Sequence, residues 1–413
     1  MDKDTNKSTY NQLFQAIYNE KFLSNVKESE VDAYAKKLTV VKLIQLVAYA
    51  QLEQLEGLRH ISNSLNDDNF SAAVGINSIS ASQLSRKLRD LSPELVQSLF
   101  SDIVYQFGIE IGFKSIRQEL GRIYLIDSST ISLCLSRYRW AEFRKTKSGV
   151  KLHLRIQLFE QGVLPDKAII KPAKPADKTQ MDALVVAKDA LNVFDRGYLD
   201  YKKFDSYCNN GTRFVSRLKS NAIVETLEEF PTNPDSLIKK DHKVILGKDG
   251  TTKMQHPLRL IETEDTEGKP VIIITNDFEL SAEELSDIYR YRWQIELFFK
   301  WIKQHFCVKH FYGLSQQAVE NQLLIALITY CLMMLLKIKT GYEGPLLKIK
   351  MLLHTCLYVE FSEFVRKLHL KSGRSSRGRR WIDHKKIYNF TVEQVLQGEA
   401  DHLDDLTYDP IIA

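Results

Sequence analysis

A group of charged and phenolic residues between positions 289 and 303 has the types and spacing needed for chemistry on phosphates. Its members are Tyr289, Arg292, Glu296 and Lys303. On one α-helix, at about 100° per residue, the four side chains share a narrow stripe at the edge of an apolar face. A carboxylate among cations can hold a metal ion while the cations bind a phosphate backbone. The pattern favours a metal-assisted reaction on phosphates, although solvated helices also carry such charges.

Two aspartates follow predicted strands and could add further carboxylates to this group. Asp127 ends the apolar run 122–127, and Asp195 ends the run 193–195. We expect the two strands to be neighbours in one sheet, with the helix that carries Glu296 packed over the same edge. Oxygen ligands alone favour Mg²⁺ or Mn²⁺. Two such ions can activate an attacking water or hydroxyl and stabilise the leaving oxygen of a phosphodiester displacement.

The periodicity of apolar residues predicts the elements that must position these carboxylates. Strands are predicted over residues 122–127, 150–159, 167–171, 193–195, 213–218 and 271–275, and helices over 178–191 and 199–208. Ser281 and Glu284 form a capping box for a further helix, which is expected to continue through Glu296. Residues 222–276 contain strand-like fragments and turns without a long helix. The order predicts an α/β protein with a β-rich insertion, flanked by helical regions.

The N-terminal region has apolar residues at helical spacing and ends in a basic segment. Ser80 or Ser82 can cap a helix that carries Gln83, Arg86, Lys87 and Arg89. Short helices joined near Gly75, the last of them basic, resemble a helix-turn-helix DNA reader. A plain helical bundle explains the same pattern, and both interpretations stay open.

Composition describes an ordinary globular protein of two or three domains. The chain has 413 residues, of which 44% are hydrophobic and 26% charged, and its net charge of +5 permits an anionic partner without proving one. The five cysteines are odd in number and lack C-x-x-C spacing, which indicates reduced thiols in a cytosolic protein. The apolar stretch 323–336 is too short to span a bilayer, so a buried helix without a membrane partner is expected.

Three blocks of residues resemble the ribonuclease-H-like catalytic core of bacterial DDE transposases. The tyrosine, arginine, glutamate and lysine described above have the spacing of insertion-sequence family four, with two, three and six residues between them. Residues 126–130 resemble the first aspartate block of that family, and residues 194–198 resemble the second. The family carries a β-rich insertion before its glutamate, where this chain has residues 222–276. The resemblance covers roughly residues 120–340.

The resemblance implies a role for each matching residue. It implies a catalytic triad that holds two Mg²⁺ ions, with Mn²⁺ as a substitute, made of Asp127, Asp195 and Glu296. It implies three residues that hold phosphates of the transposon end, namely Tyr289, Arg292 and Lys303. It further implies cleavage at the terminal inverted repeats of a transposable element, excision through a hairpin, strand transfer into double-stranded target DNA, and a homodimer that pairs two ends. The resemblance therefore also implies that the chain is a bacterial, cytoplasmic protein associated with the nucleoid.

Other basic and aromatic residues near these blocks are candidate DNA contacts. They are Arg144, Lys145, Lys147 and Lys151 around the start of the second strand, Arg196 and Tyr198 after the second aspartate, and Trp293 on the helix. Each group has a plainer explanation. The four basic residues could form a solvated hairpin, Gly197 could allow a tight turn while Tyr198 packs, and the tryptophan could pack against the core. The basic loop 371–380 could also face DNA.

The predicted organisation has four parts. They are a helical N-terminal DNA-binding domain (1–118), a ribonuclease-H-like core (119–221 and 277–340), a β-rich insertion (222–276) and a C-terminal helical region (341–413). Two other classes of function stay open. One is a transposase-derived DNA-binding protein without catalysis, against which the three intact acids argue. The other is a nuclease that cuts DNA without strand transfer.

Overall fold

The computed structural model describes residues 7–111, 121–159, 162–186, 189–265 and 268–370, and the short pieces 389–390, 392–393 and 396–397. The basic loop 371–380 lies outside these residues. The chain divides into a large unit, Met1–Leu368, and a C-terminal unit, His369–Ala413. All the elements that position the candidate site belong to the large unit, which is a mixed α/β structure.

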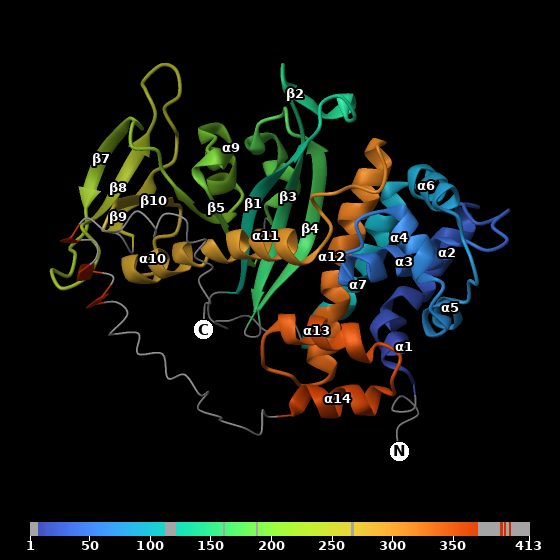
Figure 1. Cartoon of the computed structure of the whole chain (residues 1–413). Coiled ribbons are helices and arrows are strands. Elements are labelled where there is room, and N and C mark those ends of the chain that lie inside the picture. Colours follow the sequence, from blue (N-terminus) through green and yellow to red (C-terminus); the bar gives the residue numbers. More distant parts are fainter. Residues whose placement is uncertain are drawn as a thin grey trace. The chain divides into compact units, whose positions relative to one another are not determined.

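A mixed sheet of ten strands, counted over the described residues, runs through the large unit (Figure 1). Three long strands form one antiparallel part of it, namely β1 (Arg122–Leu133), β3 (Lys147–Phe159) and β4 (Gly162–Pro172). The short β2 (Glu142–Arg144) pairs with the start of β3. On the other side of β1 lie β5 (Ala190–Phe194) and β6 (Arg213–Arg217), both parallel to it.

The predicted β-rich stretch continues this same sheet. Its strands are β7 (Val224–Glu229), β8 (Lys240–Leu246), β9 (Leu258–Glu264) and β10 (Pro270–Thr275). They pair antiparallel in the order β10, β9, β8, β7, and β10 pairs with β6. A buried ion pair between Arg259 and Asp241, with atoms 2.7 Å apart, links β9 to β8. Backbone hydrogen bonds therefore connect the insertion directly to the strands near the site.

Short helical pieces follow β4 and β5 in the chain. They are η4 (Asp177–Gln180), α8 (Met181–Leu184), η5 (Arg196–Tyr198) and α9 (Tyr201–Asn209). The helix predicted over 178–191 is therefore wrong in extent. Val185 is extended, and the side chain of Asn192 hydrogen-bonds both the N–H and the C=O of Val186. These bonds and the two β-branched valines favour extended chain over further helical turns.

The helix predicted to run unbroken from Ser281 through Glu296 is two helices, α10 (Ala282–Arg290) and α11 (Trp293–His305). The capping box of Ser281 and Glu284 is confirmed at the start of α10. At the junction, the amides of Arg292 and Ile295 bond to carbonyls three residues back, at 3.0 and 3.2 Å. This tighter turn changes the winding between Tyr289 and Arg292. Figure 1 shows both helices running across the sheet.

Seven α-helices precede the sheet in the described part of the chain. They are α1 (Thr9–Phe14), α2 (Glu20–Glu28), α3 (Val40–Leu52), α4 (Leu58–Ser64), α5 (Asp68–Val74), α6 (Ala81–Asp90) and α7 (Pro93–Ile111). Three more helices follow α11, namely α12 (Gln316–Lys339), α13 (Leu346–Cys356) and α14 (Phe361–His369). Ser80, one of the two predicted caps, forms a capping box with Gln83 at the start of α6.

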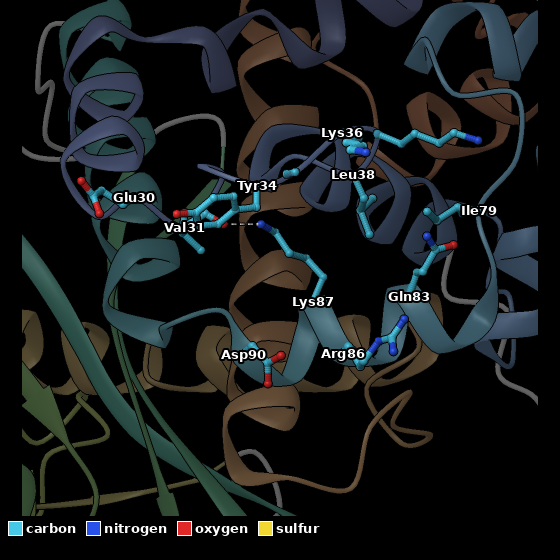
Figure 2. A pocket seen from close by; sticks show the side chains of 12 residues that line it. Glu30, Val31, Tyr34, Lys36, Leu38, Ile79, Gln83, Arg86, Lys87 and Asp90 are labelled. Atoms are coloured by element: carbon cyan, nitrogen blue, oxygen red, sulfur yellow. Dashed lines mark hydrogen bonds between the residues drawn. The ribbon is translucent and has the colours of Figure 1, made fainter.

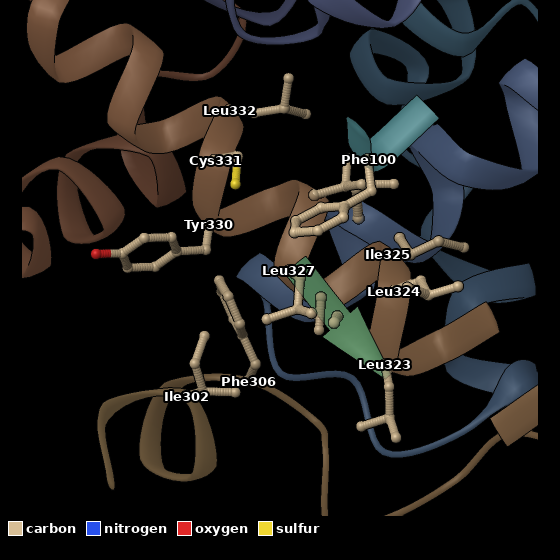
Figure 3. Close-up of a cluster of buried hydrophobic side chains, with 14 of the residues drawn as sticks. Phe100, Ile302, Phe306, Leu323, Leu324, Ile325, Leu327, Tyr330, Cys331 and Leu332 are labelled. Carbon is tan, nitrogen blue, oxygen red and sulfur yellow. The ribbon is translucent and has the colours of Figure 1, made fainter. Parts of the chain in front are cut away.

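The helix α12 joins the helical region to the sheet. It packs against α7, α3, α6 and α13, and also against β4. By length and composition it could cross a membrane, but 89% of its most apolar window is buried within the protein. Figure 3 shows Leu327 of α12 between Phe100 of α7 and Phe306, which follows α11. The predicted buried helix over 323–336 is confirmed as part of this core.

Candidate active site

The two predicted aspartates lie next to each other at the point where β5 ends. Ile126 of β1 pairs with Phe194 of β5 in parallel register, and Asp127 and Asp195 are the next residues on the two strands. Asp195 follows the last residue of its strand, as predicted. Asp127 does not end its strand, because β1 stays hydrogen-bonded to β3 as far as Leu133.

The helix α11 brings Glu296 to the same place. Its buried residues Ile295, Phe298 and Ile302 belong to one apolar cluster with Leu125 and Leu154 of the sheet. This packing holds the polar edge of α11 over β1.

Arg292 connects two of the three acids. Its Nη1 lies 2.6 Å from Oε1 of Glu296, four residues later, and 3.6 Å from Oδ2 of Asp127. Since both oxygens lie near one nitrogen atom, they cannot be farther apart than the sum of these distances. The arginine side chain is only 15% exposed. Helical spacing predicted the first contact, whereas the second depends on the fold.

Tyr289 connects the site to the third acid. Its hydroxyl donates to Oδ1 of Asp195 at 3.4 Å, and its ring lies 5.7 Å from the guanidinium carbon of Arg292. Burial raises the pKa of Tyr289 to about 12, and the charge of Arg292 opposes this increase while that of Asp195 adds to it. The phenol therefore stays protonated near neutral pH and acts as a hydrogen-bond donor.

Lys303 reaches β1 from the last turn of α11. Its Nζ donates to Oγ of Ser129 at 2.6 Å and lies 3.5 Å from the carbonyl oxygen of Thr130. All four residues of the predicted helical stripe thus meet the part of the sheet that carries the aspartates. The first aspartate block, residues 126–130, therefore supplies two acceptors for Lys303 as well as the carboxylate of Asp127.

Burial and like charges disfavour the ionised form of Asp127. Burial raises the pKa of Asp127 to about 6, and the nearby carboxylates of Asp195 and Glu296 act in the same direction. The amide of Ser128 donates to Oδ1 at 2.7 Å and, together with Arg292, opposes the increase. A cation placed among the three acids would favour the ionised form of the Asp127 carboxyl group.

The donor set fits hard divalent cations, but its arrangement leaves Arg292 between the acids. All three candidate ligands are carboxylates, which Mg²⁺ and Mn²⁺ prefer. Across the residues that the structure describes, no three Asp, Glu, His or Cys side chains are grouped closely enough to hold an ion together. The guanidinium of Arg292 lies beside two of the three predicted ligands, Asp127 and Glu296.

Comparison with known sequences decides the class of protein. Residues 118–332, more than half of the chain, match the family described as "Transposase DDE domain". The chain belongs to this transposase family. Residues 5–69 match a second family, described as a domain of unknown function, DUF4372. The transposase match covers β1, β5 and α11, and hence the three acids.

Relatives of this transposase carry matching names. A protein of Geobacillus stearothermophilus, named as a transposase for insertion sequence element IS5377, is 25% identical and covers 86% of this chain and 91% of its own length. A protein of Sinorhizobium fredii, named as transposase y4zB, is 26% identical, and the match covers 66% of this chain and 77% of that protein. A protein of Synechocystis, named as a transposase for insertion sequence element IS4SA, is 24% identical, and the match covers 66% of this chain and 78% of that protein.

A solved structure of the piggyBac transposase synaptic complex with hairpin DNA is also similar to this transposase. The match covers 97% of this chain and 86% of that one, with a TM-score of 0.41 and 11% sequence identity. This likeness is weak.

One predicted DNA contact of the transposase needs correction. Tyr198 is 1% exposed and packs with Phe194, and its hydroxyl lies 3.4 Å from Nδ1 of His153. A side chain enclosed in this way cannot reach a DNA strand, so the packing alternative is correct. Burial lowers the pKa of His153 to about 4, which keeps the imidazole neutral beside the tyrosine.

Sequence reasoning missed Asp177, which lies behind the first aspartate block. Its Oδ1 accepts from Oγ of Ser128 and from Nζ of Lys151, both at 2.9 Å, and lies 3.7 Å from His153. Lys151 was a candidate phosphate contact, but its charge is balanced by this carboxylate. No local pattern marks Asp177, because its partners come from two strands that are distant in the sequence.

The other candidate DNA contacts are on the surface of the transposase. Arg144, Lys145 and Lys147 are exposed at the hairpin between β2 and β3, and Arg196 is exposed in η5. Trp293 is 56% exposed at the start of α11. All five side chains are accessible to a partner, and their contact with DNA stays a prediction.

The basic residues of α6 are partly engaged within the protein. Lys87 donates to the carbonyl oxygen of Val31 at 2.7 Å and pairs with Asp32 at 2.6 Å, as the dashed line in Figure 2 shows for the first contact. Arg86 lines an open cavity of about 770 Å³ that also contains Lys36 and the exposed Tyr34. Lys87 therefore contributes to the packing of the helices, and Arg86 remains available for a partner.

Proposed function

We propose that this transposase cuts and joins DNA at the ends of an insertion sequence, with Asp127, Asp195 and Glu296 as its metal-binding triad. The observation that carries the proposal is the gathering of these three acids, distant in the sequence, around Arg292 and Tyr289. When bound, two Mg²⁺ ions would supply an activated water or hydroxyl and stabilise the leaving oxygen. Mn²⁺ would substitute, because it accepts the same oxygen ligands.

The protein's own residues would orient the DNA. Tyr289, protonated near neutral pH, can donate its hydroxyl to a phosphate oxygen. Arg292 offers a planar fork that suits phosphate, and Lys303 a single ammonium group. These three donors lie on α10, on α11 and at the junction between them, and each contacts one of the acids or the first aspartate block. Together they would hold the scissile strand against the carboxylates.

The order of the strands supports a ribonuclease-H-like core within the proposed family four. The strands β4, β3 and β1 are antiparallel neighbours, and β5 and β6 continue on the other side of β1, parallel to it. The proposed parts are the N-terminal DNA-binding helices (1–118), this core (119–221 and 277–340), the insertion (222–276) and the C-terminal region (341–413). We infer a cytoplasmic protein that acts as a homodimer on terminal repeats and target DNA, with a hairpin intermediate.

The direct test uses DNA from both flanks of the gene that encodes this chain. Purified protein, Mg²⁺ and labelled flanking duplexes should give nicks at defined positions, then hairpin or double-strand ends, and finally joined products with a target plasmid. Cutting without joined products would favour the alternative of a nuclease without strand transfer. Binding without any cutting, in Mg²⁺ and in Mn²⁺, would overturn the catalytic proposal.

Lys303→Ala should weaken binding to the cut duplex and flatten its dependence on salt. Each lysine–phosphate contact releases counterions, so the slope of log K against log [salt] should fall by about 1. The measurement is fluorescence anisotropy over a series of salt concentrations. Lys253→Ala is the matched control, because Lys253 already pairs with Glu225 and Asp249 in the insertion. Equal slopes for Lys303→Ala and the parent would remove Lys303 from the phosphate contacts.

A further inference from the structure

Arg292 occupies the oxygens that a metal ion in the proposed triad would need. One guanidinium nitrogen lies 2.6 Å from Glu296 and 3.6 Å from Asp127, so a single cation serves two of the three acids. Its Nε is buried and has no hydrogen-bond partner among the described residues. The guanidinium therefore uses only part of its donor capacity where it lies.

The surrounding structure holds Arg292 in this place. The tight turn between α10 and α11 fixes its backbone, since the Arg292 amide bonds to the carbonyl of Tyr289 at 3.0 Å. The Tyr289 ring lies against the guanidinium, and its hydroxyl reaches Asp195. Arg292 is thus held against Asp127 and Glu296, while Tyr289 reaches Asp195.

A divalent ion that bridged Oδ2 of Asp127 and Oε1 of Glu296 would lie close to the guanidinium nitrogen that already contacts both atoms. Mg²⁺ binds carboxylate oxygens at about 2.0–2.1 Å, so it would approach these two oxygens more closely than Nη1 does. Two cations at this separation also repel each other strongly in a partly buried site. The positive charge of Arg292 therefore opposes the binding of an ion between Asp127 and Glu296 as long as the guanidinium stays in this place.

We propose that Arg292 is a built-in competitor of the metal ion, which closes the acidic site until the guanidinium is displaced. The proposal rests on the metal site described under the proposed function and adds an order of events to it. Arg292 first neutralises the acids and becomes available to a DNA phosphate only after it has left them. By linkage, the cost of displacing it lowers the affinity of the protein for metal in the absence of DNA.

The test measures Mn²⁺ binding to the full-length protein without DNA, by isothermal titration calorimetry and by Mn²⁺ paramagnetic resonance. Arg292→Ala should bind Mn²⁺ more tightly than the parent, on the order of tenfold. Arg292→Lys, which keeps a charge but lacks the planar fork, should lie between the two. Arg290→Ala is the matched control, because Arg290 is a neighbouring arginine that pairs with Asp287, at 3.2 Å, and not with one of the three acids among the described contacts. It should bind Mn²⁺ as the parent does.

A second readout guards against a misfolded variant. Without metal, Arg292→Ala should melt at a lower temperature than the parent, because the acids lose their counter-cation. Mn²⁺ should raise its melting temperature more than it raises that of the parent. Unchanged or weaker Mn²⁺ binding by Arg292→Ala would overturn the proposal. A Glu296→Ala variant distinguishes failure of the Arg292 proposal from failure of the proposed metal site. If Glu296→Ala still binds Mn²⁺ as the parent does, the ion binds elsewhere, and the proposed triad is wrong.

Discussion

Replacing Glu296 with glutamine is expected to reduce DNA cleavage by at least roughly three orders of magnitude, while DNA binding persists. The amide keeps the size of the side chain and its place on α11, but it is neutral and a poor ligand for Mg²⁺. Asp127→Asn and Asp195→Asn should have effects of similar size, since each would remove one oxygen ligand from the proposed pair of ions. Single-turnover cleavage of the flanking duplexes gives the rate, and anisotropy gives the affinity.

A control on the neighbouring helix makes this result specific. Glu283 is an exposed glutamate in the first turn of α10, and Glu283→Gln should cleave at close to the parent rate. Binding of duplex by Glu296→Gln should equal or exceed that of the parent, because a negative charge has been removed near the phosphates. Cleavage by Glu296→Gln at the parent rate would exclude this glutamate from the chemistry.

Leu327→Ala is expected to lower the free energy of unfolding by about 2–5 kcal/mol. Leu327 is 1% exposed and lies in α12, the helix that packs on the N-terminal helices and on β4. Truncation removes buried apolar surface and leaves a cavity that close-packed neighbours fill poorly. Because α12 contributes to both regions, we expect both to lose stability together. Urea unfolding, followed by tryptophan fluorescence and by far-UV circular dichroism, measures the change.

An exposed leucine serves as the comparison. Leu347 lies in α13 and is 37% exposed, so Leu347→Ala should change the free energy of unfolding by no more than about 0.5 kcal/mol. A Leu327→Ala protein as stable as Leu347→Ala would mean that the core around α12 repacks freely. Separate transitions by the two probes would instead show that the helical region and the sheet unfold independently.

The local features of the site could be predicted because they depend on residues close together in the sequence. The pairing of Arg292 with Glu296 follows from helical spacing, and the capping box at Ser281 follows from its two residue types. Asp195 was expected at the end of a strand because an apolar run stops there. In each case the deciding interaction spans at most one helical turn or one strand.

Some errors arose where packing overrides local preference. The run 178–191 has helical spacing, yet Asn192 binds the backbone of Val186 and favours extended chain. Tyr198 follows an exposed arginine and glycine, yet its ring is buried with Phe194 beneath the sheet edge. Neither outcome is visible from residue type and periodicity, because Asn192 and Phe194 take their positions as part of β5, which is fixed by its pairing with β1 and β6.

The sequence alone determined which acids could act, their order along the chain, and which elements carry them, because residue type and periodicity are local properties. The tertiary structure decided which side chains contact those acids. It keeps Asp127 within a continuing strand, breaks the helix after Arg290, and sets the guanidinium of Arg292 between Asp127 and Glu296. These contacts join segments far apart in the chain, and their geometry depends on how α11 and the sheet bury a common apolar face.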